Sequence, residues 1–131
     1  MEEELLRSFD REVVARGYAN RSEAIRDLIR ERLIRDKWRR GGRVVGVIAL
    51  VYDHRVRGLE ERITDIQHHF SGEVISSMHV HLDSDHCLEV IAVRGEAHRI
   101  RELTLRLVGL KGVKHGDLIA TAGVEEGKGT P

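Results

Sequence analysis

A run of nine apolar residues near the middle of the chain constrains the fold more than any other feature. Residues 44–52 read VVGVIALVY and are rich in β-branched side chains, a composition typical of a strand buried in a sheet. This is the longest unbroken apolar run, and nine residues are too few to cross a bilayer as a helix. We therefore expect a domain built around a central strand, and no membrane segment.

The segments that follow predict the rest of this domain. Apolar spacing of three to four residues indicates helices, whereas alternation indicates strands. The expected order is β-α-β-β-α-β, the ferredoxin-like arrangement of an α+β fold. The central strand is followed by helix 57–70, strand 73–82, strand 87–95, helix 97–112 and strand 113–122. The predicted inward-facing residues are Leu59, Ile63 and Ile66 on the first helix and Ile100, Leu103, Leu107 and Leu110 on the second.

The first forty residues have a different pattern, which predicts two amphipathic helices joined by a short turn. Gly17 suits the left-handed position after the first helix. Asn20 is a good N-cap for the second, and Glu23 completes the capping-box spacing. Two apolar stripes result, formed by Leu5, Leu6, Phe9, Val13 and Val14 and by Ala24, Ile25, Leu28, Ile29 and Leu33. Two short helices cannot bury both stripes, so this module needs a partner chain.

Charge also divides the chain. Residues 1–43 carry 12 Lys and Arg against 9 Asp and Glu, whereas residues 44–131 carry 10 against 13. This asymmetry indicates a basic module for a polyanion joined to a second module; a helix end whose cations suit the helix dipole is the alternative. We expect modules at 1–42 and 43–122, hinged at the glycine pair 41–42, and a disordered tail at 123–131. One cysteine and no signal peptide indicate a cytoplasmic protein.

The stretch HVHLDSDHC, residues 79–87, concentrates possible metal ligands. His79 and His81 lie two apart on a predicted strand and so share one face, which would leave Met78, Val80 and Leu82 on the opposite, core face. A two-residue turn at 84–85 would pair Cys87 with Leu82. A three-residue loop at 83–85 would instead place Cys87 opposite His81. A metal site therefore requires the odd-length loop.

A fourth ligand could come from His68 or His69, at the end of the preceding helix. Three imidazoles and one thiolate suit Zn(II) in tetrahedral geometry and Ni(II) or Cu(II) in square-planar geometry. A buried structural cysteine beside solvent-facing histidines is the alternative interpretation. There is no H-E-x-x-H arrangement and no nucleophile-base pair, so we expect a protein that is not an enzyme.

Five stretches, in the order RGYANRSEAIRDLIR, VYDH, QHH, HVHLDSDHCLE and GVKHG, resemble the nickel-responsive transcriptional regulators, the NikR family. The resemblance covers nearly the whole chain. It implies an N-terminal ribbon-helix-helix DNA-binding domain and a C-terminal ACT-like domain. It also implies a homotetramer, a dimer of dimers joined through the C-terminal domains, in which nickel promotes binding to operator DNA and represses nickel uptake.

The resemblance also implies the sites. One square-planar Ni²⁺ per subunit would be held by His79, His81 and Cys87 together with His68 of a neighbouring subunit. Tyr52 and Glu89 match positions around these ligands. Glu23 and Asp27 match a secondary cation site between the two domains. His54 and His115 match family positions as well. We expect them to be polar surface residues or to make interface hydrogen bonds rather than to bind the metal.

The resemblance ends at the N-terminus, where family members have a short base-reading strand before the first helix and this sequence has Met1. Asn20, Arg21 and Ser22, at the start of the second helix, would then supply phosphate contacts that do not read sequence. We expect such a chain to bind nickel but to bind operator DNA poorly. The alternative functions are a metal-binding ACT-type oligomer without sequence-specific DNA binding and, less supported, a zinc enzyme.

Overall fold

The computed structural model describes residues 2–122 of the chain. These residues belong to two compact units, Met1–Asp36 and Lys37–Pro131, which are described separately. The boundary lies inside a helix and before the glycine pair that we expected as the hinge, so Trp38 belongs to the second unit. The tail predicted at 123–131 lies outside the described residues. None of the described helices is long and apolar enough to span a membrane.

The first unit consists of α1 (Glu3–Ala15) and most of α2 (Arg21–Arg40). α1 ends in a Schellman motif: Tyr18 N donates to Val13 O at 3.0 Å and Gly17 N to Val14 O at 3.1 Å. Gly17 has φ +76°, as predicted for a left-handed residue. Asn20 caps α2 through a 3.0 Å bond from Glu23 N to its side chain, which confirms the predicted start.

The apolar stripes of this unit are largely exposed in the single chain. Val13 and Ala24 are its buried residues, whereas Val14 is 78% exposed and Leu33 is 61% exposed. Hydrogen bonds and ion pairs link the two helices instead. A bidentate pair joins Arg21 to Asp10, with both N–O distances at 2.7 Å.

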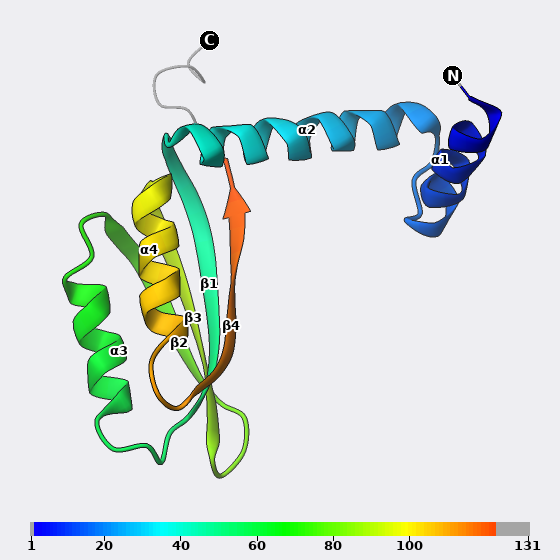
Figure 1. Cartoon of the computed structure of the whole chain (residues 1–131). Coiled ribbons are helices and arrows are strands. Elements are labelled where there is room, and N and C mark those ends of the chain that lie inside the picture. The colour runs from blue at the N-terminus through cyan, green and yellow to red at the C-terminus, as the bar shows by residue number, and fades with distance from the viewer. Residues whose placement is uncertain (1, 123–131) are drawn as a thin grey trace. The chain divides into compact units, whose positions relative to one another are not determined.

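The second unit has the predicted β-α-β-β-α-β order (Figure 1). Its elements are β1 (Arg43–Asp53), α3 (Leu59–His68), β2 (Glu73–His81), β3 (His86–Glu96), α4 (Ala97–Val108) and β4 (Val113–Thr121). The strands form one antiparallel sheet in the order β2-β3-β1-β4. Both helices lie on the same face of this sheet (Figure 1), so the α+β prediction is confirmed.

The core lies between that face and the helices. β1 alternates along its length, with Val44, Ile48, Leu50 and Tyr52 buried and the residues between them only half-buried. The predicted inward faces of the helices are confirmed, since Ile63 and Leu107 are almost fully buried. β1 is therefore covered by helices on one face only, not on both as its composition indicates.

One prediction about this core was wrong. Met78 and Leu82 of the hairpin were expected to face the core, but they are 57% and 50% exposed. The reason is the position of the helices. They cover the face that carries Tyr52 and Cys87, and therefore also the face of His79 and His81.

Trp38 anchors the C-terminal end of α2 in the second unit. Its ring is 1% exposed, and its Nε1 donates to Thr121 O at 2.8 Å. The Arg101 guanidinium lies 5.6 Å from the ring centre, within cation–π range. A Cβ at Gly46 would lie 3.3 Å from the indole, so the glycine of the apolar run makes room for this ring.

Replacing Trp38 is expected to destabilise the second unit in two steps. Trp38→Phe removes the hydrogen bond and should cost about 1 kcal/mol, whereas Trp38→Ala also opens a cavity and should cost about 3–5 kcal/mol. Urea unfolding followed by circular dichroism measures both. Leu105→Ala, at an exposed position of α4, is the control and should change stability by less than about 0.5 kcal/mol. If all three substitutions changed the free energy of unfolding equally, Trp38 would not be an anchor of the second unit.

Candidate metal centre

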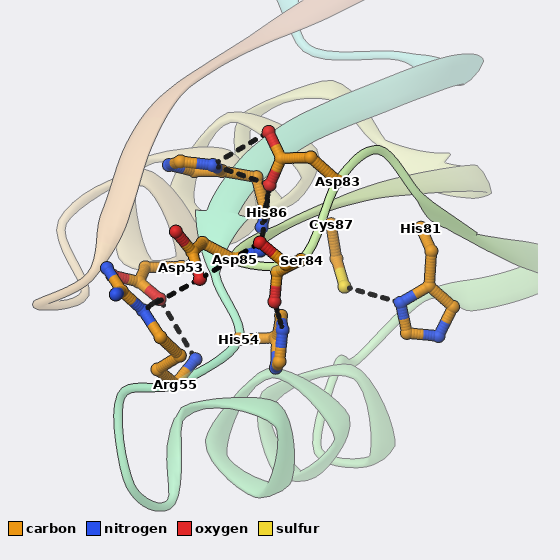
Figure 2. Close-up of polar contacts among 9 residues, drawn as sticks. All are labelled: Asp53, His54, Arg55, His81, Asp83, Ser84, Asp85, His86 and Cys87. Carbon is orange, nitrogen blue, oxygen red and sulfur yellow. Dashed lines mark hydrogen bonds and ion pairs between the residues drawn. The ribbon is translucent and has the colours of Figure 1, made fainter.

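His79, His81 and Cys87 come together at one end of the β2-β3 hairpin. In the sheet His81 pairs with Cys87 and His79 pairs with Glu89, and directly paired residues point to the same face. The possible ligand atoms of the two histidines and the cysteine all lie within 4.8 Å of one another. His81 Nδ1 and Cys87 Sγ face each other at 3.4 Å (Figure 2).

The hairpin loop has the length that this arrangement requires. Leu82 N donates to His86 O at 2.9 Å, so residues 83–85 form the loop and the two-residue alternative is excluded. The Asp83 carboxylate accepts bonds from Asp85 N and His86 N, each at 2.8 Å. These bonds, together with the His86 side chain, lower the pKa of Asp83. The loop is thus ordered from within by an aspartate turn.

The three candidate ligands differ in exposure. Cys87 is fully buried, whereas the His79 side chain is 36% exposed and His81 is exposed. Burial raises the pKa of the Cys87 thiol. The thiolate is the form that binds a metal, so a cation at this position must displace the thiol proton.

The ring of His79 is oriented by two neighbours that the family resemblance implied. Its Nδ1 lies 3.1 Å from the Tyr52 hydroxyl and 3.2 Å from Glu89 Oε1. A carboxylate only accepts, so the bond to Glu89 requires the proton on Nδ1. Nε2 is then the unprotonated nitrogen that can bind a cation. Burial raises the pKa of Tyr52 above its usual range, so its hydroxyl stays protonated.

Gln67 also belongs to this surrounding layer, and sequence reasoning missed it. Its Nε2 donates to Glu89 Oε2 at 3.5 Å. The signal was available in the helical spacing, since Gln67 is one residue after the buried Ile66 and four after the buried Ile63. The residue belongs to the QHH stretch, in which only the two histidines are possible metal ligands.

His68 and His69 do not join the cluster in this chain. His68 is the last residue of α3 and is exposed, and His69 follows it as the C-cap. The His69 ring is occupied locally, with Nδ1 2.8 Å from Asp65 O. Among residues 2–122, no fourth His, Cys, Asp or Glu belongs to the group.

The residues predicted for the secondary cation site and for phosphate contacts lie in the first unit, and four of the five have hydrogen-bond partners there. Glu23 accepts a 3.0 Å bond from Ala19 N, one residue earlier than the N-cap amide of a standard capping box. Asp27 accepts a hydrogen bond from the Tyr18 hydroxyl. Asn20 is used as the cap, Ser22 is exposed, and Arg21 is held by Asp10.

Fold and site together define a two-part protein: a helix pair followed by an ACT-type domain with a cluster of two imidazoles and a thiol. Residues 45–121 match the family described as the NikR C terminal nickel binding domain. Residues 1–36 match the ribbon-helix-helix proteins of the copG family. The chain belongs to the NikR family of nickel-responsive regulators. The family is one of transcriptional regulators and not of enzymes.

Individual proteins agree with this assignment. A protein of Chlorobium phaeobacteroides assigned as a nickel-responsive regulator is 54% identical over 115 residues, covering 88% of this chain and 86% of its own length. One of Geobacter metallireducens with the same assignment is 48% identical over 127 residues, covering 96% and 91%. The solved ACT domain from GTP pyrophosphokinase of Chlorobium tepidum aligns with TM-score 0.52 over 60% of this chain and 100% of that domain. At 14% identity this last likeness shows the fold alone.

Removing either neighbour of His79 is expected to weaken metal binding without unfolding the domain. Tyr52→Phe and Glu89→Gln each leave the ring less firmly oriented, and we expect nickel affinity to fall about 10- to 100-fold. Titration followed by thiolate-to-nickel absorbance measures the affinity, and circular dichroism checks the fold. Tyr18→Phe, which removes a hydroxyl in the first unit, is the matched control. Unchanged affinity in both site variants would show that neither Tyr52 nor Glu89 orients His79 for metal binding.

Proposed function

We propose that this chain senses nickel through His79, His81 and Cys87, completed by His68 of a neighbouring subunit, with one Ni²⁺ per subunit. Bound nickel would raise the affinity of a homotetramer for operator DNA and so control nickel uptake. The observation that carries the proposal is the convergence of two imidazoles and a buried thiol on one point. That convergence depends on the hairpin register and on the odd-length loop.

The donor set fits one first-row metal ion. With metal-nitrogen and metal-sulfur distances of about 2.0 and 2.3 Å, donors on opposite sides of an ion are roughly 4.3 Å apart. The candidate atoms, all within 4.8 Å of one another, need little movement to reach that spacing. A mixed nitrogen and sulfur set suits tetragonal Ni(II) or Cu(II) as well as tetrahedral Zn(II). Family membership favours nickel among them.

A ligand from a second subunit would explain how the metal acts on assembly. His68 is exposed at the end of α3 and is not part of the cluster in its own chain. Apolar side chains such as Ile119, which is 62% exposed, and Met78 leave a sheet surface suited to burial against another copy. An ion that binds one arrangement of subunits better than others shifts the population toward it.

The first unit would make the contacts with DNA. The N-terminus of α2 presents backbone N–H groups beside Asn20, Arg21 and Ser22, a position suited to a phosphate. Glu23 and Asp27 lie one turn apart on the same helix, where a secondary cation could bind. The nickel-bound arrangement would set the spacing of these units and thus their fit to DNA.

Mixing two defective variants tests the shared site. His68→Ala and Cys87→Ser should each lose the thiolate-to-nickel band. Random reassembly of equal amounts should restore about a quarter of the sites, because only mixed pairs of subunits rebuild one complete site. His69→Ala is the matched control and should keep full binding. If mixing restores nothing although subunits exchange, His68 is not supplied by a neighbour. A band that survives in Cys87→Ser would rule out the ligand set.

Selection from a random duplex library tests the DNA part. With nickel, the chain should bind duplex DNA more tightly than with a chelator, where binding should be weak and should fall steeply with salt. Enrichment of a defined sequence with nickel would show that the chain reads bases as well as phosphates. Cys87→Ser should behave like the chelated protein in both solutions. Nickel binding without any enriched sequence would favour the alternative, a metal-binding ACT-type oligomer that does not read sequence.

A further inference from the structure

The hairpin loop that joins the candidate ligands is held from outside by three consecutive residues (Figure 2). These residues, Asp53, His54 and Arg55, follow directly on the buried part of β1 and are called the loop clamp here. His54 N donates to Asp85 O at 2.9 Å. The His54 ring reaches the same loop, where its Nε2 donates to Ser84 O because a carbonyl can only accept.

Asp53 fixes the base of the clamp. Its side chain is almost buried, with the residue 8% exposed, and its N–H donates to Gly112 O at 2.9 Å. Its carboxylate accepts three bonds from Arg55, from N and Nη2 at 2.9 Å and from Nε at 3.0 Å. These bonds hold the pKa of Asp53 far below its usual range. A bidentate, charge-assisted pair of this kind restricts Arg55 to one geometry.

Arg55 also reaches the loop. Its Nε lies 3.5 Å from Asp85 Oδ1, so one guanidinium joins a buried carboxylate at the end of β1 to a carboxylate of the loop. The loop itself, Asp83, Ser84 and Asp85, has no apolar side chain to pack into the core. Its position relative to the sheet therefore depends on these polar contacts and on the strand ladder.

The contacts of the loop clamp lie next to the strand positions that hold the candidate ligands. His86 pairs with Asp53 and Cys87 with Tyr52, while Cys87 also pairs with His81 across the hairpin. A slip of one residue at this point would move Cys87 to the other face of the sheet. Metal ligands must also be held within about 0.5 Å of their working positions, which a loosely attached hairpin does not achieve.

We propose that the loop clamp positions the metal hairpin, with Arg55 as a positioning residue that keeps Cys87 and His81 at coordination distance. The proposal rests on the nickel ligands proposed above. It assigns a role to Arg55 and Asp53, for which no contact with a candidate ligand is seen among residues 2–122. His54 contributes twice, since its ring also lies edge-on to the His81 ring with their centres 6.2 Å apart.

The test compares the metal affinity of full-length variants. Arg55→Gln and Asp85→Asn each remove the charge pair between clamp and loop, and each should weaken nickel binding about tenfold. The double variant should be no weaker than the worse single one, because both changes remove the same link. Arg55→Lys should recover part of the loss. Arg57→Gln is the matched control, since Arg57 has no ion pair among residues 2–122, and it should bind like wild type.

Two further measurements separate the possible failures. In the metal-free chain, Arg55→Gln should speed hydrogen exchange of the Leu82 and His86 amides but leave the core amide of Ile48 unchanged. The clamp proposal would be overturned if Arg55→Gln had the same amide hydrogen exchange and nickel affinity as Arg57→Gln. It would also be overturned if the losses of affinity in the double variant were additive. If Cys87→Ser kept the nickel band of the wild-type chain, the proposed ligands would be refuted. The hydrogen-exchange rates alone would then show whether the loop clamp holds the hairpin.

Discussion

The backbone ladder between β1 and β3 is the constraint on which the rest of the second unit depends. It pairs Tyr52 with Cys87, and the hairpin ladder then pairs Cys87 with His81. Three neighbouring strands therefore present a phenol, a thiol and an imidazole in one row on one face. Because side chains alternate strictly along a strand, this row exists in one register only. The apolar residues of β1 hold that register by burying every second side chain under α3 and α4.

Because the row lies on the helix-covered face, the candidate ligands have unequal surroundings. The sulfur lies inside the core, where burial disfavours a bare thiolate. The histidines lie farther out, with His79 tied to Glu89 and, through it, to Gln67 of α3. A divalent cation at this point would lie beside the Glu89 carboxylate and would favour the thiolate of Cys87 over the thiol.

Much of this could be predicted from the sequence because the patterns were local. The element order, the Gly17 turn and the Asn20 cap depend on residues close in sequence. Strand pairing reduced the hairpin loop to two alternatives, of which a metal site requires the odd-length one. The face of the hairpin was predicted wrongly because Met78 and Leu82 look like core residues, while which face the helices cover is decided by residues far away in the chain. The loop clamp was missed for a similar reason: His54 and Arg55 meet Ser84 and Asp85 across some thirty positions. Polar contacts between residues so far apart in the chain produce no periodic pattern in the sequence.

Trp38 has a practical consequence for anyone who studies this protein in solution. It is the one tryptophan of the chain, and its indole is enclosed by β4, Gly46 and the Arg101 side chain. Fluorescence excited at wavelengths that only tryptophan absorbs therefore originates in the second unit. Loss of structure in the helix pair would leave that emission unchanged. A folded signal by this probe describes the ACT-type domain and carries no information about the unit that matches DNA-binding proteins.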